Sequence, residues 1–224
     1  MKALKYMRID MNRTKAQIWC MLLFGVMAYG FSYSAGNILS GIFYLMFAAV
    51  IMQGAVFTYE QKPETGFTNM LPGTDLDRIA GRFMTGVFLL LDGILLGMAV
   101  TIVLYFQGKV QLSYLPEILI ILMGFGLIFM AIQNVIFYIV GKGKSQQLMS
   151  FIHMLPGFIL WIGASVLLTF LDVEGEEISK IFKVLLWMKE NSIFVSLVVL
   201  GLGIIFTIAG IFITEKIVSR KDFA

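Results

Sequence analysis

The chain has 224 residues with a formal net charge of +3; 59% of the residues are apolar and 14% are charged, and the mean hydropathy is +0.88. This composition excludes an ordinary soluble domain, the wealth of large apolar side chains excludes a disordered chain, and the single cysteine, Cys20, excludes a scaffold held by disulfides. The remaining class is an integral membrane protein.

Residues 1–15 begin the chain with apolar side chains interspersed among five basic ones. This mixture predicts an amphipathic helix that lies in a membrane interface, and a frayed basic tail is the alternative. A cleaved signal peptide is disfavoured because its apolar region covers about 7 to 15 residues, whereas the apolar stretch that follows is longer and begins late.

Six later stretches are long and apolar enough to cross a bilayer, whose core of about 30 Å needs roughly 20 residues of helix. They are residues 18–36, 38–59, 83–106, 118–140, 148–171 and 193–214. Strands of a membrane barrel would alternate apolar and polar residues, whereas these stretches are apolar on all sides. The sequence therefore predicts an all-α, polytopic membrane protein in which residues 16–224 form a single six-helix transmembrane domain.

The basic residues predict the orientation of these spans. All but four of the 17 Lys and Arg residues lie in the N-terminal segment, the second loop, the fourth loop or the C-terminal tail. In the loops on the other side, carboxylates outnumber the remaining lysines. Because positive charge is retained in the cytoplasm, we expect both termini to be cytoplasmic. On the outer side, residues 178–188 have the apolar spacing of a short interfacial helix before span six.

The loop between spans two and three predicts a short cytoplasmic helix that leads into span three. Pro72 and Gly73 form a stop, after which Thr74 can cap a new helix with Asp77 at the third position. Asp75 and Asp77 also favour the positive end of that helix. Such a cap needs only local residues, so this element is expected to begin at Thr74.

The same segment carries a mixed polar and apolar surface. Leu76 and Ile79 are three positions apart and are flanked by Arg78 and Arg82. This arrangement suits docking into the groove of a protein better than lying on lipid. We therefore interpret the segment as a docking element.

Asp92 is the one carboxylate within a predicted span. It lies about 15 Å inside the cytoplasmic end of span three, near the middle of the bilayer, where a charge is costly. Gln53 of span two and Gln133 and Asn134 of span four are its candidate hydrogen-bonding partners. Two interpretations stay open: polar packing between helices, or a water-facing or proton-sensitive path.

Other motifs give no catalytic or metal site. His153 is the only histidine, so a His-Glu-x-x-His motif is excluded, and Asp92 alone cannot form an aspartyl pair. Gly143-Lys144-Ser145 lacks the earlier glycine of a phosphate-binding loop and is explained as a basic cytoplasmic turn. Pro156 removes a backbone hydrogen bond within span five and predicts a helix kink there.

The second loop contains, in chain order, Glu60, Leu71-Pro72, Thr74, Ile79 and Gly81-Arg82-Phe83, with which span three begins. This run of an acidic residue, Leu-Pro, a Ser or Thr, and a small-basic-aromatic ending resembles the second loop of the membrane subunits of type-2 ATP-binding-cassette (ABC) exporters. The six spans and the basic N-terminal segment extend the resemblance over the whole chain. Asp75 departs from it, because a basic residue often stands at that position.

The resemblance implies a non-catalytic permease subunit of an ATP-driven exporter in a bacterial plasma membrane. A separate cytoplasmic ATPase, which would bind ATP and Mg²⁺, would dock on residues 60–82, and this chain would hold no cofactor and no nucleic acid. The implied docking residues are Thr74, Asp75, Leu76, Arg78, Ile79 and Arg82. A second copy or a similar permease would complete a dimeric path for an amphipathic peptide, a drug or a lipid.

Two other functions are alternatives to the ATP-driven exporter. Asp92 alone favours a secondary carrier or a proton-coupled channel. Such carriers usually show paired broken helices in two halves, and only span five carries a proline bend. A membrane partner or sensor that transports nothing is the third possibility.

Overall fold

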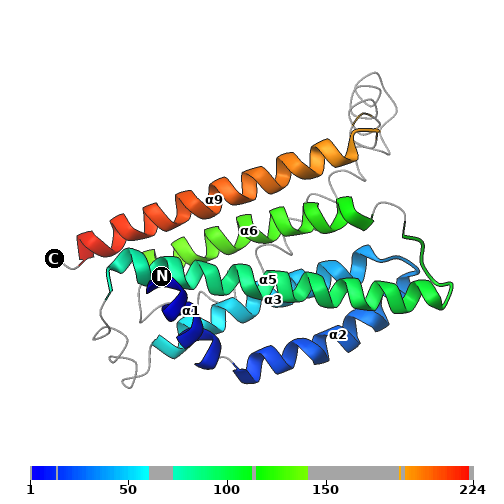
Figure 1. The fold of residues 1–224 in the computed structure, drawn as a ribbon, viewed down its shortest axis with the longest axis horizontal. Coiled ribbons are helices and arrows are strands. Elements are labelled where there is room, and N and C mark those ends of the chain that lie inside the picture. The colour runs from blue at the N-terminus through cyan, green and yellow to red at the C-terminus, as the bar shows by residue number, and fades with distance from the viewer. Residues whose placement is uncertain are drawn as a thin grey trace.

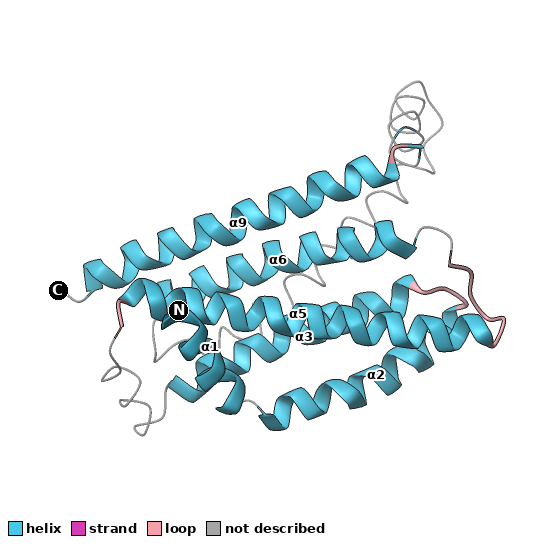
Figure 2. Cartoon of the chain, viewed as in Figure 1, coloured by secondary structure: helices cyan, strands magenta, loops and turns pink. Residues whose placement is uncertain are grey.

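The computed structural model describes residues 2–13, 15–60, 73–112, 115–140, 187 and 190–221. Six helices lie in these residues: α1 (Lys2–Arg13), α2 (Lys15–Ala35), α3 (Leu39–Glu60), α5 (Asp75–Phe106), α6 (Leu115–Val140) and α9 (Ser192–Lys221). This part of the chain contains no strand (Figure 2). The all-helical prediction is therefore confirmed over the described ranges.

Several predicted features lie outside the described residues. They are residues 61–72 of the second loop, the turn Gly143-Lys144-Ser145, span five (148–171) with His153 and Pro156, and, apart from Trp187, the predicted interfacial helix 178–188. The kink at Pro156 stays a prediction.

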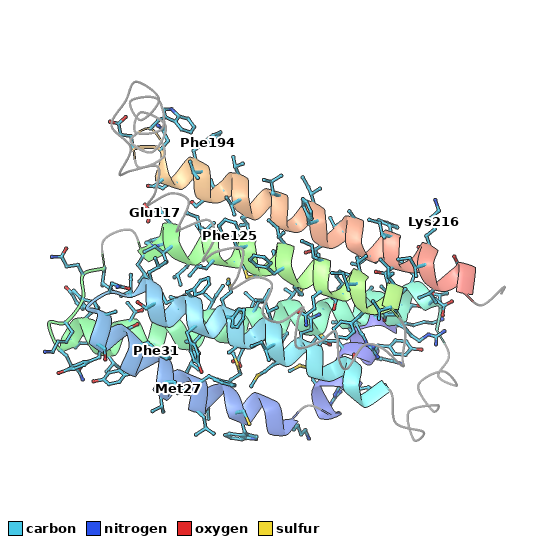
Figure 3. The ribbon with its side chains drawn as sticks, turned by 180° about the vertical axis from the view of Figure 1, so that it is seen from behind. Met27, Phe31, Glu117, Phe125, Phe194 and Lys216 are labelled. Atoms are coloured by element: carbon cyan, nitrogen blue, oxygen red, sulfur yellow. The ribbon has the colours of Figure 1, made fainter. Side chains whose placement is uncertain are left out.

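Three of the helices are long and apolar enough to cross a membrane by themselves. They contain the stretches Asp75–Phe106, Leu115–Val140 and Ser192–Ser219, and shorter apolar stretches, Trp19–Ala35 and Leu39–Gly54, lie in α2 and α3. The outer faces of these helices are apolar: Met27 and Phe31 of α2 and Phe194 of α9 are exposed (Figure 3). Such faces suit lipid, so the chain is a multi-pass membrane protein. The number of six spans and the orientation of the termini stay predictions.

A short turn joins α2 to α3. Gly36 adopts a φ of 63°, a left-handed conformation that ends a helix and that glycine adopts without strain. Asn37 then caps α3, because its Oδ1 accepts hydrogen bonds from the Ser40 backbone N–H at 3.0 Å and from the Ser40 hydroxyl at 2.6 Å. The two helices consequently pack against each other as antiparallel neighbours (Figure 1).

Helix α5 lies at the centre of the arrangement and packs against α1, α2, α3, α6 and α9 (Figure 1). It is 32 residues long and includes the segment that the sequence predicted as a separate short helix. That prediction was wrong about the boundary: residues 75–82 form the first two turns of the same helix as span three. No proline occurs in residues 75–106, so the backbone hydrogen bonds continue from Arg82 into Phe83.

Helices α6 and α9 lie side by side and run in the same direction. Near the N-terminal ends of both helices, the Ser192 hydroxyl donates to Glu117 Oε1 at 3.4 Å. Further along, a side chain at Gly203 would meet the Gly124 carbonyl oxygen at 2.6 Å. The two backbones therefore approach closely through glycine, as small residues permit in membrane helices.

Candidate functional site

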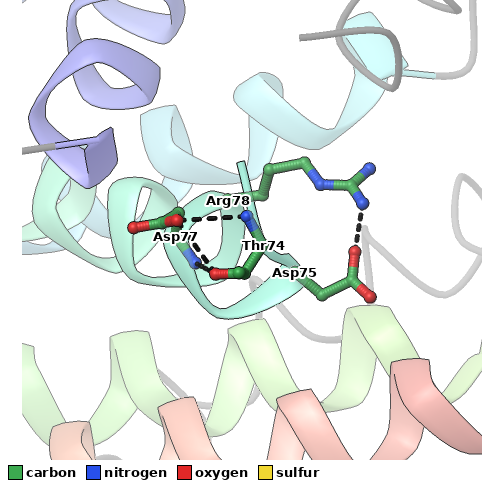
Figure 4. A network of polar contacts seen from close by, with 4 residues as sticks. All are labelled: Thr74, Asp75, Asp77 and Arg78. Atoms are coloured by element: carbon green, nitrogen blue, oxygen red, sulfur yellow. Dashed lines mark hydrogen bonds and ion pairs between the residues drawn. The ribbon is translucent and has the colours of Figure 1, made fainter. Parts of the chain in front are cut away.

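The first turn of α5 is held by a capping box. The Asp77 backbone N–H donates to Thr74 Oγ1 at 3.2 Å, and the Thr74 backbone N–H donates to Asp77 Oδ2 at 3.1 Å (Figure 4). Arg78 forms an ion pair with Asp75 in the same turn. The cap predicted from Thr74 and Asp77 is thus confirmed, and Arg78 already has a partner within its own helix.

The six predicted docking residues fall into two groups. Those at the surface, exposed or half-buried, are Thr74, Asp75, Leu76 and Arg78. Ile79 is 2% exposed and belongs to the main hydrophobic core, and Arg82 is 6% exposed. The expectation that Ile79 and Arg82 lie on an open docking face therefore does not match the structure, because both side chains are buried within the chain itself.

Helix α1 packs on the N-terminal end of α5, at Gly81 and Arg82, which we call the base of α5. A side chain at Gly81 would meet Tyr6 Cβ at 2.6 Å and the Ala3 carbonyl oxygen at 2.8 Å, so only glycine permits the observed approach. Beside it, Arg82 Nε lies 3.5 Å from Asp10 Oδ2 in an ion pair whose two side chains are both 7% exposed.

Sequence reasoning missed the partner residues on α1. Tyr6 is buried against α5, and Asp10 pairs with Arg82. One signal pointed to Asp10: it is the only carboxylate in the otherwise basic residues 1–15. An isolated acidic residue in a basic segment often has a specific basic partner, but the sequence does not identify which of the basic residues that is.

The polar residues of the spans lie at two separate places. Gln53 Nε2 of α3 donates to Asn134 Oδ1 of α6 at 3.0 Å, and both side chains are buried. Gln133, next to Asn134, is also buried. The structure thus brings two of the predicted polar residues into contact, with the third adjacent in sequence.

Asp92 is half-buried and lies on another flank of α5. Leu90 packs where Gly126 of α6 leaves room, whereas Leu96, one turn beyond Asp92, packs on Gly25 of α2. Residues four apart share a helix face, so Asp92 belongs to the α2 flank. Among the described residues no hydrogen bond joins it to the amide side chains of α3 and α6, and the expected four-residue polar site is not formed.

A comparison with known protein families identifies the chain. A family model described as "ABC-2 family transporter protein" matches residues 5–219, whereas no individually curated protein and no solved structure matches. The match covers nearly the whole chain and agrees with the apolar, all-helical architecture. The chain therefore belongs to the ABC-2 family of transporter proteins.

Proposed function

We propose that the chain is the transmembrane permease subunit of an ATP-driven exporter and that a separate cytoplasmic ATPase docks on the first turn of α5. The capped turn from Thr74 to Arg78 carries this proposal, because it presents a rigid polar surface at one end of a helix that touches every other described helix. ATP and Mg²⁺ would bind to the ATPase. Hydrolysis of this ATP would then move α5 through the capped turn.

Helix α1 supports the same surface from the side. Leu4 is 54% exposed, and the basic residues Lys5 and Arg8 are exposed as well, while Tyr6 and Asp10 face the protein. We place α1 in the cytoplasmic interface, where Leu4 would reach the acyl boundary and the basic side chains the lipid headgroups. Both termini would then be cytoplasmic.

The proposed cargo is an amphipathic molecule, namely a peptide, a drug or a lipid, that leaves the cell. A second copy of the chain, or a similar permease, would complete the path. The long apolar helices and the family membership support a membrane path.

The docking surface is tested by Leu76→Glu in the chain co-expressed with its ATPase. Leu76 is half-buried in the capped turn, so a carboxylate there would have to be desolvated against the partner. We expect ATPase affinity to fall by about 2 kcal/mol, or roughly 30-fold, in a co-purification titration, with membrane insertion unchanged. Gln111→Glu, at an exposed position on the predicted outer side, is the matched control.

A charge exchange refines this test. Asp75→Arg combined with Arg78→Asp keeps an ion pair within the turn but reverses the order of its charges. Loss of ATPase binding in this double variant supports recognition of the surface charges. If the exchange and Leu76→Glu both retain the ATPase at the level of the control, the docking surface lies elsewhere.

The rival function, a proton-coupled carrier, is tested at Asp92. An ATP-driven permease needs no proton at this position, and an amide keeps the size and hydrogen-bonding capacity of the carboxyl group. We expect Asp92→Asn to assemble with the ATPase and to export cargo at the rate and pH dependence of the wild-type protein. An assembled Asp92→Asn complex without transport would instead support a water-facing or proton-sensitive path at Asp92.

A further inference from the structure

We give the name amide layer to three buried amide side chains, Gln53 of α3 and Gln133 and Asn134 of α6. Gln53 and Asn134 share a hydrogen bond. Gln133 lies two turns after Gly126, on the face of α6 that packs against Met46 of α3 and Leu90 of α5. The three amide side chains are 2%, 2% and 0% exposed. Four of their polar atoms have no hydrogen-bond partner, namely Gln53 Oε1, Gln133 Oε1, Gln133 Nε2 and Asn134 Nδ2. Buried polar atoms are nearly always paired, so a set of four in one layer requires an explanation.

Flipping the amide groups by 180° does not provide these four atoms with hydrogen-bond partners. Gln53 and Asn134 share one hydrogen bond of 3.0 Å, which uses one nitrogen and one oxygen. An amide carries both a donor and an acceptor. Flipping both groups therefore exchanges which residue donates, and one oxygen and one nitrogen still have no hydrogen-bond partner. Gln133 adds one more of each.

The neighbouring helix is adapted to this layer. A side chain at Gly86 of α5 would overlap the amide group of Gln53. Helix α5 thus lacks a side chain at the point where the amide of α3 enters, and three helices enclose the layer. A glycine at that position makes room for a polar group that an apolar membrane core would otherwise exclude.

The atoms without a hydrogen-bond partner define the chemistry of a ligand that would bind there. Two acceptors and two donors are open, and none of the three residues carries a charge, so an ion would find no counter-charge within the layer. Arg82, one turn towards the start of α5 from Gly86, is already paired with Asp10. The complementary ligand is a neutral group that both donates and accepts hydrogen bonds.

We propose that the amide layer of Gln53, Gln133 and Asn134 is a binding site for such a neutral donor–acceptor group, supplied either by internal water or by an amide group of the cargo. Only the cargo source rests on the proposed export function. Asp92 is not part of this site, because it lies on the α2 flank of α5.

Whether the substitution Gln133→Met raises or lowers the thermal midpoint tests whether the amide layer holds a ligand. Gln133→Met keeps the volume of the side chain and removes both of its polar atoms. If the layer is occupied, the substitution removes hydrogen bonds, and we expect the thermal midpoint in nanodiscs to fall by about 2 to 4 °C. A rise in the midpoint overturns the proposal, because removing unpaired atoms from a dry layer stabilises the protein. Gln111→Met, which removes an exposed amide, is the control.

Hydroxyl-radical labelling tests whether water reaches the layer. Met130 and Phe137 lie one turn to either side on α6 and are 0% and 5% exposed, so bulk water does not explain their labelling. We expect both to be labelled in the wild-type protein and at least about fivefold less in Gln133→Met. Met46, 1% exposed and packed two turns away against Gly126, is the dry reference. Labelling of Met130 and Phe137 no higher than that of Met46 overturns the proposal.

The two sources are separated by adding N-acetyl-leucyl-leucinamide, a neutral peptide amide, to the wild-type complex. Reduced labelling of Met130 and Phe137 assigns the site to a peptide amide that displaces water, and unchanged labelling assigns it to water. Neither the midpoint nor the labelling needs ATP hydrolysis. A failure of this site is therefore distinguishable from a failure of the export function.

Discussion

Replacing Gly203 by alanine is expected to force α9 away from α6 and to destabilise the folded bundle by about 2 to 3 kcal/mol. The added Cβ would lie 2.6 Å from the carbonyl oxygen of Gly124 and 3.1 Å from its Cα. Both are backbone atoms, so the contact cannot be relieved by a side-chain rotation and one helix has to move. Unfolding in a denaturing detergent, followed by circular dichroism, measures the effect.

Gly201 provides the matched control on the same helix. It faces open space, since apart from its chain neighbours and the backbone of its own helix no atom would lie within 4 Å of an added Cβ. Gly201→Ala should therefore leave the bundle as stable as before or slightly more stable, because alanine favours helix. Equal stability of the Gly201→Ala and Gly203→Ala proteins would contradict the close approach of the two backbones.

Removing one partner of the Asp10–Arg82 ion pair is the other change with a large expected effect. Both side chains are 7% exposed, and an uncompensated charge left in such a site costs about 3 to 5 kcal/mol. We expect Asp10→Asn and Arg82→Gln each to release α1 from the base of α5. Faster tryptic cleavage after Lys5 or Arg8 in inverted membrane vesicles measures that release.

The double variant shows whether the two residues act together. Asp10→Asn combined with Arg82→Gln leaves no charge at the contact, so its cleavage should be slower than that of either single variant. The loss of α1 packing in the double variant should be well below the sum of the losses in the two single variants. Additive losses would show that the two residues stabilise α1 independently.

The sequence predicted the elements that depend on neighbouring residues. The capping box needs only Thr74 and Asp77, three positions apart, and the long spans need only a run of apolar side chains. The boundary at Arg82 was placed wrongly because the side chains change from polar to apolar there. That change alters the surroundings of the helix and leaves its backbone hydrogen bonds intact.

Burial of Ile79 and Arg82 could not be predicted in the same way. It depends on tertiary packing, which in the case of Arg82 comes from α1, about 70 residues earlier in the chain. The polar residues of the spans pose a similar problem. Their identity is evident in the sequence, but the rotation of α5 decides that Asp92 lies towards α2 while Gln53 meets Asn134 beside Gly86.

The unbroken course of α5 has a mechanical consequence. A helix of 32 residues is about 48 Å long, and without a proline or a bulge it bends little. A tilt of about 5° about Gly93 would therefore displace Phe106, about 20 Å further along the helix, by about 2 Å. Gly86, Gly93 and Gly97 lie along its contact with α3, where the absence of a side chain lets α3 approach α5 closely. If the ATPase docks on the capped turn as proposed, a tilt imposed near Thr74 would therefore also move Phe106 at the opposite end of α5.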